Sequence, residues 1–491
     1  MKRLSQATLC DLPAGVSRPG YDRGATRIGI VHLGIGAFHR AHQAVMTEAV
    51  LAAGDLAWGI AGVSLRSAET RDALAPQDGL YSVAVRDGTG DRFAVVGAVL
   101  RLLVAPEDPV AVLDLMAASE TRLISLTITE KGYCHLPATG ELDETHPDIV
   151  HDLAHSERPR TAIGFLVEAI VRRREAGLPP FTVLSCDNLP ANGRTLARVV
   201  TRFAALRDPA LAEHVKTRVA FPCSMVDRIV PATTDADRAL VAGALGVEDA
   251  WPVTTEPFLQ WVIEDRFPEG RPNWEGAGAL FVTDVEPFEQ MKLRLLNASH
   301  STLAYLGYLA GHQTVAEVMA APGFAALLDQ MMREEVSPTL PPLEGFDLAA
   351  YRAMLLARFR NPALHHRTWQ IAMDGSQKLP QRLLGTIRDR IKAGAGFERL
   401  ALGVAAWMVY ATGRDEAGNP IDMRDPLASR FAAATAGKRQ ASALVEAYLG
   451  IREVFGDDLS ASTPFRTTLV RVLDGLLADG AARTARSFER T

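Results

Sequence analysis

The chain has 491 residues, of which 48% are hydrophobic and 22% are charged, a composition typical of globular proteins and unlike that of disordered or fibrous chains. Lysine and arginine total 52 against 58 aspartates and glutamates, and the formal charge of -6 gives no global electrostatic footprint for nucleic acid. The length accommodates two large domains.

The four cysteines are far apart in the sequence and form no C-x-x-C pair, which disfavours a disulfide framework and a structural zinc cluster. Scattered thiols are typical of a reducing cytoplasm. The N-terminal segment lacks the apolar core of a signal peptide, and the longest apolar run, near 400–411, is shorter than the ~20 residues that span a bilayer. We therefore expect a cytoplasmic protein that binds neither membranes nor nucleic acid.

The first half of the chain alternates short apolar runs with helical stretches. The predicted strands are 27–33, 58–65, 93–100, 123–129 and 181–186, and the predicted helices include 38–53 and 162–176. The strands show little alternation of polar and apolar residues, as expected where helices cover both faces of a sheet. This pattern predicts an α/β fold with a Rossmann-type, doubly wound parallel sheet.

The second half of the chain has a different periodicity. From about Phe288 it is helical nearly to the end, after a loop-rich stretch at 266–280 and one more short strand. We therefore expect a Rossmann-type domain at 1–286 and a mostly α-helical C-terminal domain at 287–491.

A glycine turn, Gly34-Ile35-Gly36, follows the first predicted strand and precedes the first predicted helix. Gly34 allows a tight turn, and Gly36 allows a pyrophosphate to approach the backbone where the helix begins. The third position of the dinucleotide fingerprint is His39 instead of glycine or alanine. On the pattern alone, dinucleotide binding and a plain tight connection both stay open.

The fingerprint also has an acidic residue at the end of the second strand, where it holds the ribose 2′-hydroxyl. Here that end reads SLRSAE, so Arg66 stands at the expected acidic position. Arg66 could contact a 2′-phosphate, stack on adenine while NAD is used, or be a solvated loop arginine.

The stretch 285–311 carries Glu289, Lys292, Asn297 and His300 on a helix that is otherwise apolar. At roughly 100° per residue, these four side chains fall within an arc of about 140°. A polar stripe on such a helix indicates a site, although lysine and glutamate often line a surface and a histidine can be a core residue.

Further polar groups follow apolar runs elsewhere in the chain. Asp187 and Asn188 end the strand at 181–186, where ligands bind in α/β sheets, although an Asx turn also explains them. No tyrosine is followed by lysine four positions later, and no catalytic zinc motif is present. A metal-free enzyme with lysine as the base is compatible with what remains.

Seven segments carry a family resemblance. They are GIGAFHRAHQ (34–43), QDGLY (77–81), TITEKGY (127–133), SCDNLP (185–190), MVDRIVP (225–231), KLRLLNASHS (292–301) and DGSQK (374–378). Together they resemble the long-chain polyol dehydrogenases, the mannitol dehydrogenase family. HHRTWQIAMDGSQKLPQRLL (365–384) is most similar to the D-mannonate oxidoreductase, or fructuronate reductase, branch.

The resemblance implies a metal-free, NAD(P)-dependent secondary-alcohol dehydrogenase and assigns roles to eight side chains. Lys292 would be the general base, Asn188 and Asn297 would hold the reacting oxygen, and His300 would orient substrate hydroxyls. Glu289 and Glu130 would exchange protons with solvent, and Asp227 and Lys378 would contact the polyol chain. A lysine amine can take the alcohol proton where burial and nearby cations lower its pKa toward neutrality.

The resemblance also implies that the N-terminal domain binds NAD. The expected cofactor-binding residues are Gly34, Ile35, Gly36, Ala37, Phe38, Arg66 and Thr127. The family pattern has an acidic residue where Arg66 stands, and NADP therefore stays an alternative.

The leading prediction is interconversion of D-mannonate and D-fructuronate, whose carboxylate requires a cation. Arg367 is the expected partner, with Arg294 as the alternative. Mannitol 2-dehydrogenase or another polyol dehydrogenase, for example one for arabinitol, is the second prediction. A non-catalytic NAD(P)-binding regulatory protein is disfavoured because Lys292, both asparagines and His300 are retained. The expected partner is a small sugar acid or polyol, bound by a monomer or small homo-oligomer.

Overall fold

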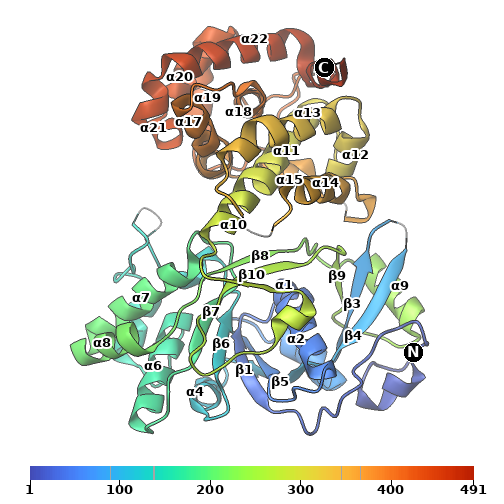
Figure 1. Cartoon of the computed structure of the whole chain (residues 1–491), viewed down its shortest axis with the longest axis vertical. Helices are drawn as coiled ribbons and strands as arrows, with labels where there is room; N and C mark the ends of the chain where they lie inside the picture. The colour runs from blue at the N-terminus through green and yellow to red at the C-terminus, as the bar shows by residue number, and fades with distance from the viewer. Residues whose placement is uncertain (89, 137–138, 344–345, 365, 491) are drawn as a thin grey trace. The chain divides into compact units, whose positions relative to one another are not determined.

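The computed structural model describes residues 1–88, 90–136, 139–343, 346–364 and 366–490. The chain forms two compact units, an N-terminal unit, Met1–Glu286, and a C-terminal unit, Pro287–Thr491 (Figure 1). None of the helices in the described part is both long enough and apolar enough to span a bilayer.

A five-stranded parallel sheet organises the N-terminal unit, with the strand order β5-β2-β1-β6-β7. Its strands are β1 (Ile28–Leu33), β2 (Gly59–Ser64), β5 (Val99–Val104), β6 (Leu123–Leu126) and β7 (Thr182–Ser185). Counted along the sheet's own strands this is the order 3-2-1-4-5 of a doubly wound fold, in which the topology reverses between β1 and β6. The predicted Rossmann-type sheet is confirmed.

Helices cover both faces of this sheet (Figure 1). The side chains of alternate residues, such as Ile30 and Val31, belong to the two opposite cores. The helices of one face are α4 (Pro109–Ala117), α6 (Ala162–Glu175) and α7 (Asn192–Arg207), and the other face holds α1 (Ala37–Ala41) and α2 (Gln43–Ala52). The remaining helices of the unit are α3 (Glu69–Leu74), α5 (Pro147–Ala154), α8 (Pro209–Arg218) and α9 (Asp235–Leu245).

Two three-stranded sheets complete the N-terminal unit. One has the order β4-β3-β9 and the other the order β11-β10-β8. Their strands are β3 (Tyr81–Arg86), β4 (Asp91–Val96), β9 (Val253–Thr255), β8 (Ser224–Asp227), β10 (Gln260–Glu264) and β11 (Leu280–Val282).

The prediction of one strand at 93–100 was wrong. β4 pairs antiparallel with β3, whereas β5 joins the parallel sheet. Gly97 separates them, because its N–H donates to Glu48 Oε2 at 2.7 Å and its carbonyl oxygen accepts from Arg23 Nε at 2.9 Å instead of joining a ladder. An apolar run carries no signal for such a change of sheet.

Two other predicted elements differ from the expectation. The helix predicted at 38–53 is broken at His42, whose φ of -119° and ψ of -92° are not helical. The strand predicted at 123–129 ends at Leu126, because Asp187 takes the N–H groups of Ile128 and Thr129 that a longer strand would give to a neighbour.

The described part of the C-terminal unit is mostly helical, as predicted. Its α-helices are α10 (Glu286–Met291), α11 (Ala298–Leu309), α12 (Val315–Ala320), α13 (Phe324–Gln330), α14 (Leu348–Phe359), α15 (Thr368–Ala372), α16 (Gly375–Leu379), α17 (Gly385–Lys392), α18 (Glu398–Tyr410), α19 (Ala428–Thr435), α20 (Ala441–Leu449), α21 (Arg452–Ala461) and α22 (Thr463–Arg486). Almost all residues of α11 and α18 are buried, and these two helices pack together in the core of the unit.

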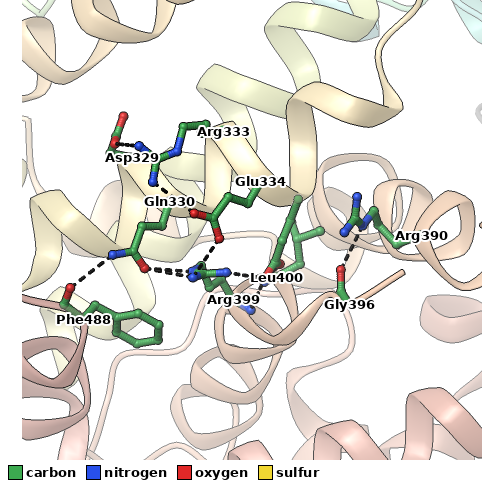
Figure 2. A network of polar contacts seen from close by, with 10 residues as sticks. Asp329, Gln330, Arg333, Glu334, Arg390, Gly396, Arg399, Leu400 and Phe488 are labelled. Atoms are coloured by element: carbon green, nitrogen blue, oxygen red, sulfur yellow. Dashed lines mark hydrogen bonds and ion pairs between the residues drawn. The ribbon is translucent and has the colours of Figure 1, made fainter. Parts of the chain in front are cut away.

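Three segments of the described C-terminal unit are π-helical, namely η5 (Lys292–Asn297), η6 (Met331–Val336) and η9 (Pro380–Leu384). Figure 2 shows how η6 is held: Arg399, in the first turn of α18, binds Gln330 and Glu334. Arg399 also pairs with Glu335, which is 2% exposed and accepts the N–H of Leu400 at 2.9 Å. π-turns are rare and often occur at functional sites. The residues of η5 and η9 are therefore candidates for the functional site.

Candidate functional site

A cavity of about 1100 Å³ opens in the N-terminal unit at the carboxyl ends of the parallel strands. Its lining includes the glycine turn after β1 and the segments that follow β2, β5 and β6. The crevice outside the carboxyl ends of the strands, at the topological switch point, is where doubly wound sheets bind nucleotides. The cavity is therefore the candidate cofactor site.

The two glycines of the turn differ in the space available for a side chain: Gly34 has none, and Gly36 has open space beside it. Gly34 has a φ of +94°, and a Cβ atom there would lie 2.1 Å from the carbonyl oxygen of Thr127. At Gly36 a Cβ atom would meet, among the described residues, the carbonyl oxygen of Gly34 at 3.9 Å and nothing nearer. This open approach to the backbone fits a dinucleotide pyrophosphate.

Buried and partly buried polar side chains pack against the glycine turn. Thr127 Oγ1 donates to the carbonyl oxygen of Gly34 at 2.7 Å and lies 2.8 Å from His32 Nε2. The His39 ring stacks on His32 with centroids 3.4 Å apart, and neither His39 nitrogen has a hydrogen-bond partner among the described residues. Burial lowers the pKa of His32 to about 3 and that of His39 well below its usual value, so both rings are neutral. His39 is therefore a core residue packed beneath the turn.

Five of the predicted cofactor-binding residues line the cavity. They are Gly34, Ile35, Gly36, Arg66 and Thr127. Ala37 and Phe38 lie in α1 and are not part of the lining, and the Phe38 ring stacks on His42 at 4.9 Å. The Arg66 side chain is exposed at the end of β2.

Asp187 positions the loop that carries Glu130. Its carboxylate accepts the N–H groups of Ile128 and Thr129, each at 3.0 Å, and the Tyr133 hydroxyl at 2.8 Å. Thr129 has a φ of +61° and a ψ of 164°, a conformation that costs a β-branched residue about 1–3 kcal/mol and needs such support. Burial raises the pKa of Asp187, while these hydrogen bonds favour its ionised form. The sequence marked Asp187 only as part of a strand-end cluster.

Three predicted site residues of the N-terminal unit follow strands or lie at their ends. Glu130 begins a short 3-10 helix, Glu130–Tyr133, and its side chain is exposed. Asn188 follows β7 and is also exposed, whereas Asp227, the last residue of β8, is only 5% exposed. The neighbouring Arg228 donates to the carbonyl oxygen of Glu256 and has a structural role.

The predicted polar stripe of the C-terminal unit does not lie on a regular α-helix. Glu289 is in α10, Lys292–Asn297 forms the π-helix η5, and His300 is in the first turn of α11. The angular estimate at 100° per residue was therefore wrong for this stretch. In a π-helix the hydrogen bonds run from i to i+5, and residues five apart, such as Lys292 and Asn297, lie about one turn from each other. Lys292 is 9% exposed and His300 is 8% exposed.

Aromatic rings and cations surround His300. Its ring lies 4.7 Å from that of Phe359 and 5.1 Å from that of His366. Burial lowers the pKa of His300 well below its usual value, and His366, Arg358, Arg382 and Lys292 lower it further. His300 is thus neutral, and its Nε2 atom has no hydrogen-bond partner among the described residues.

Arg382 is one of these cations, and Lys378 lies close enough to Arg382 for the pKa of the lysine to be affected. Lys378 Nζ donates to the carbonyl oxygens of Ile371 at 3.2 Å and Met373 at 2.5 Å. Burial lowers the pKa of Lys378 to about 8, and the charge of Arg382 acts in the same direction. Sequence reasoning did not single out Arg382, although it lies in the quoted segment 365–384, because nothing in that segment distinguishes it from the other cations there.

The two arginines nominated from the sequence have different surroundings. Arg294 already has partners within the protein: it pairs with Asp389 at 2.7 Å and donates to Thr339 Oγ1 at 2.9 Å. Arg367 precedes α15 and its side chain is exposed. In the described parts of both units, no group of three or more His, Cys, Asp or Glu side chains is arranged to hold a metal ion.

Two family models match the chain. The Rossmann domain of mannitol dehydrogenase matches residues 28–276, and the mannitol dehydrogenase C-terminal domain matches residues 284–476.

Relatives match over nearly the whole length. The chain is 48% identical over 472 residues to the uncharacterized oxidoreductase YeiQ of Escherichia coli strain K12, covering 96% of each chain. It is 46% identical over 478 residues to D-mannonate oxidoreductase from the same strain, covering 96% of this chain and 98% of that protein. The structure of Pseudomonas fluorescens mannitol 2-dehydrogenase, in a ternary complex with NAD and D-mannitol, is 41% identical and superposes with a TM-score of 0.85 over 99% of both chains.

Proposed function

Because this chain belongs to the mannitol dehydrogenase family of oxidoreductases, we propose that it interconverts D-mannonate and D-fructuronate as a metal-free, NAD(P)-dependent secondary-alcohol dehydrogenase. The observation that supports a sugar acid is the presence of three cations around His300, namely Arg358, Arg382 and Lys292, with Lys378 close to Arg382. A carboxylate is costly to bury without a cation, so such a group suits a charged substrate. Similarity to D-mannonate oxidoreductase supports the same assignment.

The cavity of the N-terminal unit is assigned to the cofactor. Gly34, Ile35 and Gly36 would hold its pyrophosphate against the backbone, and Arg66 would lie toward the adenosine end. Thr127 supports the turn through its hydrogen bond to Gly34. Ala37 and Phe38 are proposed to contribute only through the start of α1. When bound, the nicotinamide supplies the hydride chemistry.

Proton transfer is assigned to Lys292. Oxidation of a secondary alcohol requires removal of the hydroxyl proton, and the amine of Lys292 would accept it. In the reverse direction the ammonium would return the proton to the oxygen. The side-chain amides of Asn297 and Asn188 are assigned to the reacting oxygen, where they would stabilise the negative charge that develops on it.

The remaining assignments concern substrate orientation and proton exchange. The neutral His300, whose Nε2 atom is buried without a described partner, would bind a substrate hydroxyl. Glu289 and Glu130 would exchange protons between Lys292 and solvent. Asp227 and Lys378 would contact the hydroxyls of the carbon chain.

A second candidate function is that of a mannitol 2-dehydrogenase or another polyol dehydrogenase. The similarity to Pseudomonas fluorescens mannitol 2-dehydrogenase over 99% of both chains favours it. The two functions differ in one substrate group, the carboxylate.

Initial rates distinguish the two functions. The purified enzyme would be assayed with D-mannonate, D-mannitol and D-arabinitol, each with NAD and with NADP, and in reverse with D-fructuronate and D-fructose. We expect the highest kcat/KM for the mannonate–fructuronate pair. A higher kcat/KM for fructose than for fructuronate would overturn this assignment and leave the polyol function.

A further inference from the structure

We propose that Arg382 is the residue that receives the carboxylate of the substrate, an assignment that rests on the proposed function. Arg382 lies in the π-helix η9, and most of its side chain is buried within the C-terminal unit. It is neither of the arginines that the sequence nominated.

The hydrogen bonds of Arg382 join it to the segment that carries the proposed catalytic residues. Its Nη1 atom donates to Ser301 Oγ at 3.1 Å and to the backbone carbonyl oxygen of Asn297 at 3.4 Å. Both acceptors are neutral. A guanidinium has five N–H donors, and those on Nε and Nη2 have no hydrogen-bond partner among the described residues.

Two other partly buried arginines of this unit pair with carboxylates. Arg399 pairs with Glu334 at 3.0 Å (Figure 2). It also pairs with Glu335 at 3.2 Å, and Arg294 pairs with Asp389. Arg382 has no carboxylate within ion-pair distance in the part of the chain that the structure describes. Even a partly buried cation without a counter-ion is costly, and a substrate carboxylate bound in two hydrogen bonds would compensate that cost.

The neighbours of Arg382 also favour an anionic ligand. Lys378, four residues earlier, is positively charged below about pH 8, and the carboxylates of Asp374 and Asp425 act on it without a described hydrogen bond to its amine. Asp425 instead accepts the hydroxyl and the N–H of Ser376. The partnerless Nε2 atom of His300 is a second, independent indication that a polar ligand completes this group.

The experiment compares Arg382→Met with Arg367→Met and with Arg360→Met. Arg360 is an exposed arginine that ends α14 and serves as the matched control. For Arg382→Met we expect kcat/KM with D-fructuronate to fall ~10- to 100-fold, while the value with D-fructose changes less than ~3-fold, since only the charge-assisted contact is lost. Arg382→Lys keeps the charge but not the planar pair of donors, and it should show an intermediate loss.

A direct binding measurement accompanies the kinetics. Calorimetric titration of D-mannonate and D-mannitol, with the fold of each variant checked by circular dichroism, should show weaker mannonate binding in Arg382→Met and unchanged mannitol binding. Equal losses for charged and neutral ligands, or a selective loss in Arg367→Met instead, would overturn the inference and leave the proposed function intact.

The proposed function can also fail independently of this inference. If the unmodified enzyme prefers D-fructose, the proposed function is wrong. Arg382 would then be tested by measuring how strongly D-mannonate inhibits the reduction of D-fructose. Inhibition that is lost in Arg382→Met would still support Arg382 as a carboxylate-binding residue. Equal inhibition of both enzymes, or none, would overturn it.

Discussion

The glycine turn after β1 and the group of cations around His300 are determined by different physical forces. At the turn, Gly34 is required because a Cβ atom would collide with the Thr127 backbone. Around His300, no backbone restriction selects the residues, and buried charges and a π-turn define the arrangement. A steric requirement of this kind can be recognised in the sequence, because only glycine satisfies it. The role of a buried charge cannot be recognised until its neighbours in the fold are known.

The two regions also differ in how their polar groups are satisfied. Beneath the turn, Thr127 Oγ1 donates to Gly34, and the carboxylate of Asp187 binds the next segment of loop. Around His300, the Nε2 atom of the ring and several donors of Arg382 have no partner among the described residues. The paired groups of Thr127 and Asp187 provide a rigid support, whereas the unpaired donors of Arg382 are suited to a polar ligand. The difference is not complete, since both ring nitrogens of His39 also have no partner among the described residues.

The largest expected effect lies in the second region, at Lys292. Lys292→Ala should lower turnover by at least ~100-fold, because it removes the proposed proton-transfer group. NADH affinity, measured by fluorescence titration, should change little, since the glycine turn is untouched. Lys392→Ala, which changes an exposed lysine at the end of α17, is the control. A loss of less than tenfold at neutral pH would show that Lys292 is not the base.

The glycine turn offers a paired test of the first region. Gly34→Ala should lower the free energy of unfolding by more than ~2 kcal/mol, because the new Cβ atom would meet the Thr127 carbonyl oxygen at a positive φ. Gly36 has a φ of -89° and open space around it, so Gly36→Ala should fold normally and bind NADH more weakly. Denaturant unfolding and NADH titration separate the two effects. Normal NADH affinity in Gly36→Ala would place the pyrophosphate elsewhere.

This contrast explains how far the sequence could predict the molecule. The parallel sheet, the helical C-terminal unit and the glycine turn followed from periodicity and from residues with special backbone freedom. The division of 93–100 into β4 and β5 did not, because it depends on Glu48 and Arg23, which are distant in sequence from Gly97. Arg382 could not be found for a similar reason, since its lack of an acidic partner is a property of the folded chain.

A third prediction compares a paired arginine with an unpaired one. Arg399→Met should lower the free energy of unfolding by about 2 kcal/mol, because Glu335 would lose a cation while still buried. Arg382→Met should leave stability unchanged or raise it, because no described carboxylate loses a partner. Urea unfolding measures both. A larger loss of stability in Arg382→Met than in Arg399→Met would make Arg382 a structural residue.

A smaller effect is expected at the edge of the cofactor cavity. Arg66→Asp should raise the ratio of kcat/KM with NAD to that with NADP by about fivefold, because an exposed like charge near a 2′-phosphate contributes only about 1 kcal/mol. An aspartate would also accept a hydrogen bond from the ribose 2′-hydroxyl, which arginine cannot do. Arg71→Asp, at a partly exposed site in α3 where the arginine pairs with Asp72 and Glu107, is the control. An unchanged ratio would mean that Arg66 does not face the adenosine ribose.

The smallest expected effect is a pH dependence caused by Lys378. Burial lowers its pKa from 10.5 to about 8, with Arg382 acting in the same direction and Asp374 and Asp425 opposing it. As the pH rises through about 8 the ammonium loses its charge, and KM for D-fructuronate should rise about threefold, since a neutral amine binds an anionic ligand more weakly than an ammonium.

Folding stability should respond to the same group in the opposite direction. Between about pH 8 and 10.5 the unfolded chain binds this proton and the folded chain does not, so the free energy of unfolding contributed by Lys378 rises with pH. Lys378→Arg stays charged over this range and should remove both trends, whereas Lys392→Arg, at an exposed site, should keep them. KM values and urea midpoints between pH 7 and 10 test this. If KM rises equally in Lys378→Arg, another group titrates and Lys378 does not contact the substrate.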